Sequence, residues 1–423
     1  MKLKKYKLGE LIEVTRGASL SGDFYATEGN YIRLTCGNFD YRNNRFKENK
    51  SKENIFYTGN FKQEFLMKKG DIITPLTEQA IGLLGSTAII PESDKYIQSQ
   101  DIAKIVCKKD MLDEKYAFYL ISSLHVKQQL SAAAQQTKIR HTSPDKIKDC
   151  VVWIPELSEQ KRIGQLLSSI DQKIALNRQI NDNLEAMAKQ LYDYWFVQFD
   201  FPNEEGKPYK SSGGKMVWNE KLKREIPKGW SSLMIGEIER NIVTGKTPSC
   251  ANEDNFGGDI PFVTIDDIRG NLFVFQAQRT LSKLGADSQS KKYLPEGSLC
   301  VSCIGTIGVM GFVARLAQTN QQVNSIIFGK EYNKEFSYFS LMLHFCNAKA
   351  KTGNVFANMN KEEFASIYIA YPSIELLQKY HEIVLPMFDA IRTNTSEILN
   401  LTKQRDELLP LLMNGQVSPL NSD

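Results

Sequence analysis

The stretch that decides the fold spans residues 163–195 and reads IGQLLSSIDQKIALNRQINDNLEAMAKQLYDYW. It contains no proline, and its apolar residues return at alternating steps of four and three, which is the heptad pattern of a helix that pairs with another helix. Residues 380–412, YHEIVLPMFDAIRTNTSEILNLTKQRDELLPLL, repeat the pattern with each position 217 residues after its counterpart. The sequence therefore predicts two long helices that are duplicates in register.

The seam residues that we expect to mediate helix pairing and partner binding are Ile163, Leu167, Ile170, Ile174, Asn177, Leu184 and Leu191 in the first helix, and Val384, Met387, Ile391, Asn394, Ile398, Leu401 and Leu408 in the second. Asn177 and Asn394 occupy the same seam position. A buried Asn commonly fixes the register of a coiled coil at a cost in stability; the alternative is that both lie at a solvated edge. Pro386 and Pro410 should kink the second helix or end it early.

The duplication extends beyond the helices, and a tandem repeat constrains the architecture before any motif is considered. Four landmarks recur in the same order: residues 8–11 match 235–238, residues 69–72 match 296–299, residues 81–85 match 307–311, and Pro155 matches Pro372. Between these landmarks, short runs of Val, Ile, Tyr and Phe are broken by Gly, Asn and Asp, which is typical of strands and turns. Short helical patterns follow in each half.

We therefore predict an α+β protein with two repeated α/β domains, each followed by a long helix. Because a repeat of this form can close about a pseudo-two-fold axis, the two helices should pair as an antiparallel coiled coil. The expected boundaries are a first domain at 1–155, a first helix at 156–196, a linker at 197–229, a second domain at 230–372 and a second helix at 373–415.

Composition places the chain among ordinary globular proteins, with 42% hydrophobic and 24% charged residues. A net charge of +4 permits a DNA partner without requiring one, because affinity depends on locally clustered cations. The N-terminal sequence lacks a signal-peptide pattern, and the longest weakly charged stretch, residues 294–314, is a poor membrane span. Seven cysteines in such a chain suggest free thiols in a reducing compartment. We expect a cytoplasmic protein without a membrane partner.

Enzyme motifs are incomplete in this sequence. Residues 244–247, TGKT, resemble part of a phosphate loop, but Arg240 stands where that loop needs glycine and Pro248 blocks an immediate helix. Cys300 and Cys303 have zinc-ligand spacing but no second pair nearby, so a buried strand is the alternative. No Pro-Pro pair is present for the base-holding motif of an amino methyltransferase. We predict no catalytic residues and no metal site.

Residues 191–230, LYDYWFVQFDFPNEEGKPYKSSGGKMVWNEKLKREIPKGW, resemble the central region of the specificity subunits of type I restriction-modification enzymes. Residues 244–268, TGKTPSCANEDNFGGDIPFVTIDDI, are similar to the opening of that family's target-recognition domains. Residues 154–163, IPELSEQKRI, resemble the start of its conserved helix. The resemblance covers essentially the whole chain. It weakens at residues 376–379, where LLQK replaces the usual Glu-Gln pair.

The resemblance implies a non-catalytic subunit whose two target-recognition domains read a bipartite sequence in double-stranded DNA. It also implies that the chain recruits two methyltransferase subunits and, for restriction, nuclease-translocase subunits. S-adenosylmethionine, ATP and magnesium would then bind those partners, with no cofactor on this chain. The alternative from another class is a coiled-coil assembly protein whose domains bind other proteins without reading DNA.

DNA contacts need cations for phosphates and polar groups for base edges, and loops between strands are their natural carriers. The candidate residues are Arg16, Ser19, Arg33, Asn38, Gln79, Lys138 and Arg140 in the first domain, and Lys246, Thr247, Ser249, Thr264, Thr306 and Asn354 in the second. Residues 41–47 mix basic and aromatic side chains as a DNA surface does, or else form a hairpin tip. Residues 221–228 suit a solvated linker or a phosphate patch.

Overall fold

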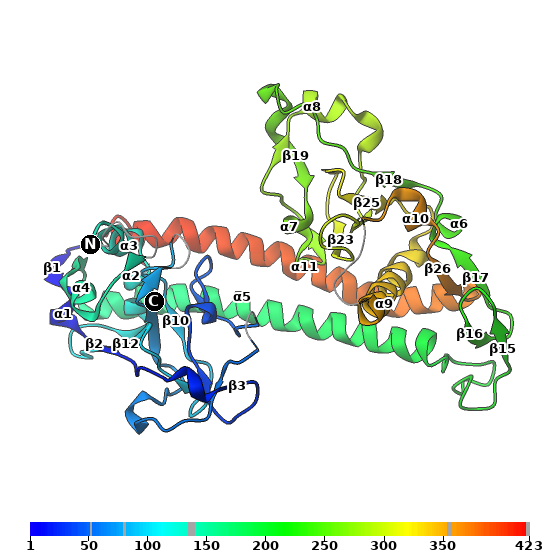
Figure 1. Cartoon of the computed structure of the whole chain (residues 1–423). Coiled ribbons are helices and arrows are strands. Elements are labelled where there is room, and N and C mark those ends of the chain that lie inside the picture. The colour runs from blue at the N-terminus through cyan, green and yellow to red at the C-terminus, as the bar shows by residue number, and fades with distance from the viewer. Residues whose placement is uncertain (51–52, 79–81, 134–139, 353–357, 420–423) are drawn as a thin grey trace. The chain divides into compact units, whose positions relative to one another are not determined.

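The structure is a computed structural model that describes residues 1–50, 53–78, 82–133, 140–352 and 358–419. Its contacts divide the chain into two compact units: unit 1 is Met1–Ile174 with Asn400–Asp423, and unit 2 is Ala175–Leu399. Figure 1 shows that each unit combines strands, short helices and segments of two long helices, α5 (Leu157–Tyr192) and α11 (Ile374–Met413). This arrangement confirms the predicted repeat of an α/β domain followed by a long helix.

Unit 1 is built on two four-stranded sheets. The main sheet is antiparallel and has the order β10 (Ala88–Ile89), β8 (Ile72–Pro75), β12 (Ile102–Cys107) and β2 (Ile12–Arg16). The second sheet has the order β11 (Tyr96–Ile97), β4 (Ile32–Arg33), β7 (Phe56–Tyr57) and β3 (Tyr25–Ala26). Three strand pairs join β1 (Lys4–Lys7) to β14 (Val151–Ile154), β9 (Thr77–Glu78) to β13 (Arg140–His141), and β5 (Phe39–Asp40) to β6 (Arg45–Phe46).

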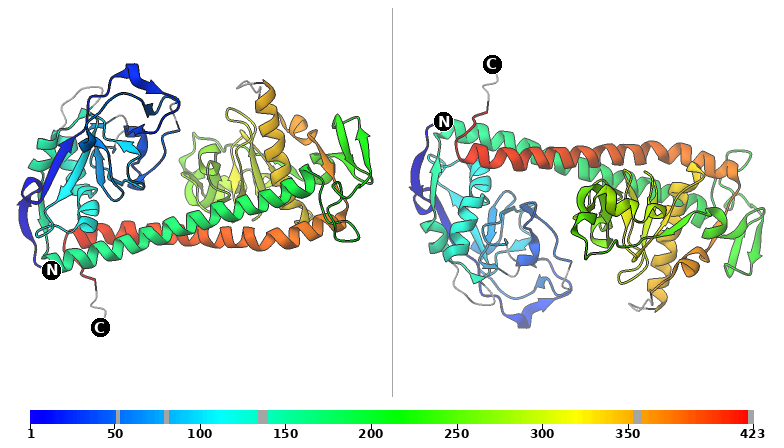
Figure 2. Two further views of the ribbon diagram at one scale, coloured as in Figure 1. Left: turned by 90° about the horizontal axis from the view of Figure 1, so that it is seen from below. Right: turned by 90° about the horizontal axis from the view of Figure 1, so that it is seen from above.

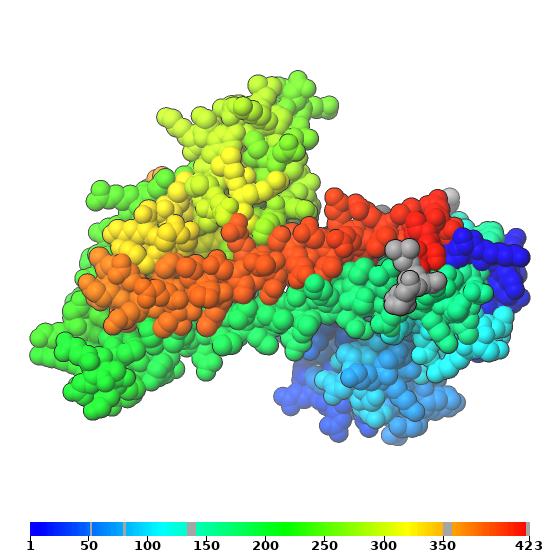
Figure 3. All heavy atoms as spheres, turned by 180° about the vertical axis from the view of Figure 1, so that it is seen from behind, coloured from blue at the N-terminus to red at the C-terminus, as the bar shows by residue number. Residues whose placement is uncertain are grey.

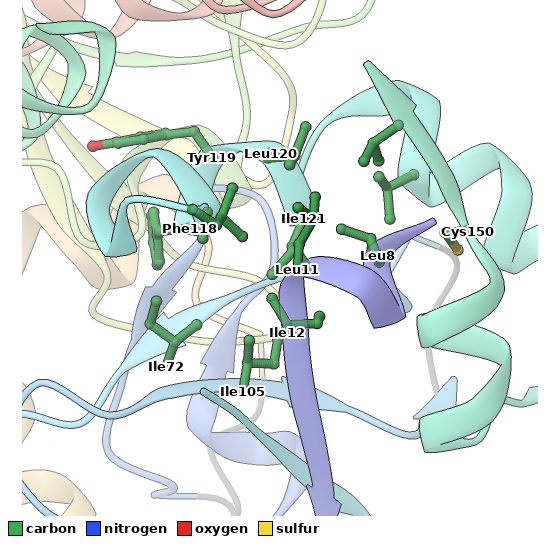
Figure 4. Close-up of a cluster of buried hydrophobic side chains, with 14 of the residues drawn as sticks. Leu8, Leu11, Ile12, Ile72, Ile105, Phe118, Tyr119, Leu120, Ile121 and Cys150 are labelled. Carbon is green, nitrogen blue, oxygen red and sulfur yellow. The ribbon is translucent and has the colours of Figure 1, made fainter. Parts of the chain in front are cut away.

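Four short helices share one core with the main sheet of unit 1: α1 (Leu8–Leu11), α2 (Glu114–Ile121), α3 (Leu124–Ala133) and α4 (Pro144–Asp149). Leu8 and Leu11 lie three residues apart on one face of α1, and Ile12 follows as the first residue of β2; all three are fully buried. Figure 4 shows them meeting the apolar side chains of α2 and of the sheet strands. Leu412 and Met413 of α11 belong to the same cluster. The globular part of unit 1 therefore shares one core with its helix segments.

Unit 2 contains a five-stranded sheet with the order β18 (Ile242–Thr244), β25 (Val323–Ile326), β22 (Leu299–Ser302), β23 (Met310–Val313) and β20 (Phe273–Val274). A three-stranded sheet has the order β21 (Thr280–Leu281), β19 (Phe256–Val263) and β24 (Gln318–Thr319). Two strand pairs join β17 (Ser231–Met234) to β26 (Tyr368–Tyr371) and β15 (Met216–Asn219) to β16 (Arg224–Pro227). The helices are α6 (Ile235–Ile238), α7 (Ile265–Ile268), α8 (Lys283–Asp287), α9 (Lys334–Thr352) and α10 (Lys361–Ala365).

The duplicated landmarks have matching structural roles. In unit 1 the backbone NH of Leu8, at the start of α1, donates to Cys150 O at 2.8 Å. In unit 2 the backbone NH of Ile235, at the start of α6, donates to Ile367 O at 3.0 Å. Each contact anchors a one-turn helix beside an antiparallel strand pair, β1–β14 or β17–β26. The sequence repeat is therefore also a structural repeat.

The two long helices run antiparallel within each unit (Figure 2). In unit 2, Asn177 contacts Glu397 while Ala188 contacts Tyr380, so the numbering rises along α5 as it falls along α11. The predicted antiparallel pairing is confirmed. Of the seam residues, Ile163, Leu167, Ile174, Asn177, Val384 and Ile391 are buried, whereas Ile170, Leu184, Leu191, Met387, Asn394, Ile398, Leu401 and Leu408 are half-buried.

The two seam asparagines both bond across the helix pair inside unit 2. Asn177 Nδ2 donates to Glu397 Oε2 at 2.7 Å, and Asn394 Nδ2 donates to Asn181 Oδ1 at 2.9 Å. Asn177 is only 6% exposed, which excludes a solvated edge for it. Since these amides have partners only when the helices are in this alignment, the contacts favour the register role.

The prediction that Pro386 or Pro410 ends the second helix early is wrong. α11 is one α-helix of 40 residues that includes both prolines. Pro386 removes the NH that would bond the carbonyl of Glu382, but both residues are exposed, so water can satisfy that carbonyl. Pro410 removes the NH that would bond the carbonyl of Asp406, which is exposed to water, and the helix ends three residues later at Met413.

The segment between α5 and β17, expected as a linker at 197–229, is ordered. The carboxylate of Asp200 accepts from the backbone NH of Ser211 at 2.7 Å and from its hydroxyl at 2.6 Å. The rings of Phe201 and Tyr209 stack with centroids 4.7 Å apart. Residues 221–228 lie at the turn and second strand of the β15–β16 hairpin. The local bonds of this segment make it a small rigid element.

In unit 1 the first residues of the chain lie beside the end of α11, as Figure 3 shows in blue and red. A Cβ atom on Gly415 would meet Leu3 at 3.0 Å, which confirms that they are close. The seven cysteines are free thiols, as expected. Within the described ranges, none of the helices combines the length and apolar character needed to cross a bilayer.

Candidate nucleic-acid interface

The ends of three strands meet at one edge of the main sheet of unit 1. Arg16, at the end of β2, lies opposite Ala103 near the start of β12. Ile102, the first residue of β12, lies opposite Pro75 at the end of β8. Because these neighbouring strands are antiparallel, the connecting segments leave the sheet on the same side. We call this place, formed by residues 16–19, 75–78 and 98–101, the unit 1 edge.

Gly17 lets the chain turn away from β2 at the unit 1 edge. A Cβ atom here would lie 2.3 Å from the backbone oxygens of both Gln98 and Ser99, so no larger residue fits without a shift of the backbone. The buried amide of Gln98 holds the facing turn by donating to Thr15 O at 2.8 Å and Ile102 O at 3.0 Å. The backbone of the loop after β2 is therefore tightly fixed.

Two predicted contact residues, Arg16 and Ser19, are exposed on this fixed loop. Arg16 Nε donates to Gln100 O at 2.8 Å, which aligns the guanidinium with the edge and leaves its other NH groups available. Gln100 is also exposed. The loop thus presents a positioned cation beside polar side chains, as phosphate and base contacts require.

The β9–β13 pair borders the same edge. Thr77 Oγ1 donates to Asp101 Oδ1 at 3.2 Å, and the backbone of Glu78 pairs with that of Arg140. The structure describes Arg140 only by its backbone. The predicted contact residues Gln79 and Lys138 lie outside the described residues, as does Asn354 of unit 2.

The other two predicted contact residues of unit 1, Arg33 and Asn38, are buried and hydrogen bonded inside the domain. The Arg33 guanidinium carbon lies 3.8 Å from the ring centroid of Tyr25, and Nη2 donates to Asn54 O at 3.1 Å. Asn38 Oδ1 accepts from the backbone NH of Thr35 at 2.9 Å, and Nδ2 donates to Lys47 O at 3.2 Å. These contacts support neighbouring loops, and neither side chain presents an exposed polar end.

Residues 41–47 lie at the tip and second strand of the β5–β6 hairpin. Of the two interpretations given for this basic and aromatic stretch, the structure therefore has the hairpin. Arg45 Nε donates to Asp40 Oδ2 at 2.7 Å. Burial opposes ionisation of Asp40, but hydrogen bonds from Arg45 and Asn43 outweigh it and lower the pKa of that carboxyl group. Arg42 and Lys47 remain exposed on the hairpin.

Unit 2 has an edge of the same construction. Thr244, at the end of β18, lies opposite Asn324, and Ser302, at the end of β22, lies opposite Val323 at the start of β25. The segments that leave the sheet here are residues 245–249, 303–306 and 318–322, which we call the unit 2 edge.

Gly245 has the same function at the unit 2 edge as Gly17 in unit 1. A Cβ atom here would lie 2.2 Å from Asn320 O and 2.4 Å from Thr319 O. The next residue, Lys246, donates its backbone NH to Thr319 O at 2.9 Å. The TGKT motif is therefore a close crossing of two backbone segments, in which Gly245 has no room to cradle a phosphate.

Four predicted contact residues lie at the unit 2 edge. Lys246, Ser249 and Thr306 are exposed. Thr247 Oγ1 donates to Gln321 Oε1 at 2.8 Å, so it shares the edge with an exposed amide.

Thr264 instead caps the short helix α7. Its hydroxyl donates to Asp267 Oδ2 at 2.7 Å, and its backbone NH donates to the same oxygen at 2.8 Å. This helix carries Arg269 just past its end, where Nη2 donates to Thr306 Oγ1 at 3.4 Å. Thr264 therefore orients the segment that supplies an exposed arginine to the edge.

Our reasoning from the sequence missed three exposed residues of the two edges: Gln100, Arg269 and Gln321. Arg269 carries a local signal, because an Arg-Gly pair directly after a capped four-residue helix marks a turn. Gln100 and Gln321 carry none, since only the strand pairing brings them to the edges. Each edge thus combines an arginine or lysine with several short polar side chains, a set that can contact phosphates and base edges.

Comparisons with known proteins agree with this construction. The profile described as "Type I restriction modification DNA specificity domain" matches residues 2–186 and 227–403. The HindI specificity subunit of Haemophilus influenzae is 29% identical over 467 aligned residues, covering 98% of this chain and 99% of that one. The MjaIX specificity subunit of Methanocaldococcus jannaschii is 25% identical over 319 residues, covering 74% and 71%.

Similarity to solved structures concerns the fold alone. A crystal structure of the S subunit of a type I restriction-modification system from M. genitalium superposes with a TM-score of 0.60 at 15% sequence identity. The match covers 98% of this chain and 96% of that one. The repeated domains and paired helices therefore have a solved counterpart over nearly their full length.

Proposed function

This chain belongs to the type I restriction-modification DNA specificity family, and from that premise we propose that it recognises a bipartite DNA sequence, with one half-site contacted by each unit. The observation that carries the proposal is the duplicated edge. Gly17 and Gly245 make the same close crossing at the same place in the sheet, and each starts a loop of exposed polar residues. Two edges built alike suit two DNA segments of comparable shape.

Different half-sites follow from different side chains on one scaffold. The unit 1 edge presents Arg16, Ser19 and Gln100, whereas the unit 2 edge presents Lys246, Thr306 and Arg269. Arginine and lysine favour guanine and phosphate, and short polar side chains accept or donate at several base edges. Gln100 and Gln321 stand at equivalent places, but Arg16 is matched by Thr244 and Ser19 by Thr247, so we expect two different half-sites.

Specificity subunits of type I systems act with methyltransferase and restriction subunits, and we propose that this chain recruits two methyltransferase subunits, one for each copy of the repeat. Support for a protein partner on the helices comes from α5 in unit 2. Leu176, Ile180 and Met187 are 55%, 38% and 53% exposed, and their spacing of four and seven puts them on one helix face. Such a stripe suits an apolar helix of a methyltransferase subunit.

We further propose that the chemistry resides on those partners, which would bind S-adenosylmethionine, ATP and magnesium. Burial raises the pKa of Cys300 to about 12 and that of Cys303 to about 11, so neither thiol is prepared to act as a nucleophile. The close crossing at Gly245 argues against a phosphate loop. A subunit that works on cellular DNA would operate in the cytoplasm.

Methylome sequencing of cells with and without this gene tests the proposal. We expect a split motif, two defined segments around an undefined spacer, that is methylated only when the gene is present. An unchanged methylome, together with no salt-dependent binding of the assembled complex to duplex DNA, would instead favour a scaffold that binds only proteins.

A further inference from the structure

A groove of about 740 Å³ lies on unit 1 where the globular domain meets the end of α11. Its lining comes from α3, β14 and the last turns of α11, together with Leu3 and Arg42. We call it the Trp153 groove. Two of its apolar side chains are unusually open to solvent: Leu124 is 70% exposed and Trp153 is 41% exposed. Adjacent apolar side chains left in water commonly mark an interaction site.

Unit 2 contains the equivalent groove, which identifies what such a site holds. Counterparts 217 residues apart in the numbering line the two grooves: Val152 and Ile369, Trp153 and Ala370, Tyr192 and Leu409, Phe196 and Met413. Each groove also contains a histidine, His125 or His344, from the helix beside it. The volume in unit 2 is only about 180 Å³.

The β15–β16 hairpin accounts for this smaller volume. Leu222 and Arg224 of the hairpin are part of the unit 2 groove lining and have no counterpart in the lining of the Trp153 groove. The Arg224 guanidinium carbon lies 4.9 Å from the centroid of Phe199, and Lys221 Nζ lies 5.4 Å from that of Tyr368 in β26. The hairpin is thus held against β26, and it covers the groove of its own unit.

The effect of this cover is visible at two leucines in equivalent helices. Leu343 in α9 is half-buried and packs against the core of unit 2, whereas Leu124 in α3 is mostly exposed. Within the described residues of unit 1, the β5–β6 hairpin reaches the lining of the Trp153 groove through the exposed Arg42, and it leaves Leu124 and Trp153 open to solvent. The same helix-and-strand surface is therefore covered in one copy of the repeat and open in the other.

We infer that the Trp153 groove binds an apolar, extended segment of a partner protein subunit in the position that the β15–β16 hairpin takes in unit 2. The inference rests on the assembly with partner subunits proposed above. It adds that this contact is made once per chain, because the matching groove of unit 2 is already covered. A partner that bound both copies of the repeat alike would need both grooves open.

The lining favours protein over DNA as the occupant. Its charged side chains, Arg42 and Asp406, have opposite signs, so the groove offers no net positive charge to a phosphate backbone. Leu409, Pro410 and Met413 add apolar surface from α11. Aliphatic side chains of a partner segment would bury this surface and gain free energy from its removal from water.

Photo-crosslinking in the complete complex tests the inference. A p-benzoylphenylalanine replaces Leu124, and in a matched control it replaces Ile89, which is 45% exposed in β10 outside the groove. We expect the probe at 124 to crosslink one apolar segment of a partner subunit at least tenfold more than the probe at 89. Crosslinks only to DNA, only to this chain, or to nothing in an assembled complex would overturn the inference.

Affinity of the full chain for its partner subunits provides the second measurement. Leu124→Asp should lower this affinity at least tenfold, whereas Ile89→Asp should change it less than twofold. Aspartate suits the first turn of a helix, so the fold of α3 is retained. An unchanged affinity in Leu124→Asp overturns the inference. If complexes methylate a split target but lack the crosslink, only the inference that the Trp153 groove binds a partner segment is contradicted. If no split target is methylated, the proposed function itself is contradicted.

Discussion

In unit 1 the helix pair is joined by a partly buried ion pair, whereas in unit 2 matching positions hold an aromatic cluster. Arg405 in α11 is 8% exposed, and its Nη1 lies 2.8 Å from Asp171 Oδ1 in α5. The counterpart of Arg405 is Ala188, whose carbonyl oxygen accepts from Tyr380 Oη at 3.2 Å. Tyr380 is fully buried and stands where unit 1 has Ile163.

The difference shows how far a duplicated helix can diverge while keeping its register. In unit 2 a small residue on α5 makes room for a large ring on α11, and Trp195 and Phe196 pack around that ring with centroids 6.0 and 5.0 Å away. In unit 1 a charged side chain fills the equivalent space and needs carboxylates to satisfy it. The backbone pairing persists because either solution fills the space between the helices.

Removing the aromatic centre should have the largest effect. Tyr380→Ala leaves a cavity among Trp195, Phe196 and Tyr192, so it should destabilise unit 2 by about 3–5 kcal/mol. Hydrogen exchange should then accelerate in residues 175–192 and 374–399 and not in unit 1. Trp218→Ala, at a ring that is 57% exposed, is the control and should change stability by less than about 0.5 kcal/mol. Equal acceleration of hydrogen exchange in both units would contradict the conclusion that the aromatic cluster stabilises unit 2 alone.

Breaking the ion pair should have a smaller effect, confined to unit 1. Arg405→Ala leaves Asp171 with the hydroxyl of Tyr119, which donates to Oδ2 at 2.5 Å. Asp171 is 30% exposed, so water can compensate in part, and we expect a loss of about 1.5–3 kcal/mol.

The double variant Arg405→Leu with Asp171→Leu removes both charges and should recover much of that loss. Denaturant unfolding of the two variants, with hydrogen exchange to locate the change, measures both effects. A double variant less stable than the single one would show that Asp171, which also accepts from the buried Tyr119 hydroxyl, stabilises the helices beyond satisfying the charge of Arg405.

The smallest effect is a pH dependence that unit 2 alone should show. His381 Nδ1 lies 2.7 Å from Glu335 Oε2, and Gly164 occupies the matching position of unit 1. The bond to Glu335 raises the pKa of His381 against the opposing effect of burial, with Glu331 and Lys334 nearby. The protonated His381 therefore stabilises the folded state. This stabilisation is fully present below the ordinary histidine pKa of about 6.5, and it is lost as the pH rises through the higher pKa of the folded protein.

Hydrogen-exchange protection of α9 should therefore be greater at pH 6 than at pH 9, after correction for the intrinsic exchange rate. His381→Gln should remove this difference. Equal protection at both pH values in the unchanged protein would show that the pair does not contribute to the docking of α9.

The sequence predicted the helices, their register and the repeat because heptad spacing is local and occurs twice. It did not predict that Arg33 and Asn38 are buried, since an Arg or Asn in a loop looks the same whether it faces DNA or, as with Arg33, stacks on Tyr25. The β15–β16 hairpin was missed because lysine and glycine in that segment suggested a linker. The prediction that Pro386 ends the second helix was wrong because the free-energy cost of the lost hydrogen bond depends on whether water reaches the unpaired carbonyl. Only tertiary packing determines that exposure.

The most direct test of two independent readers is methylome sequencing with variants in one edge at a time. Arg16→Ala with Ser19→Ala alters the unit 1 edge, and Lys246→Ala with Thr247→Ala alters the unit 2 edge. We predict that each double variant relaxes or weakens recognition of one half-site, a different half-site for each variant, and leaves the bases of the other half unchanged. Loss of both half-sites together, or of the same half-site in both variants, would contradict the account.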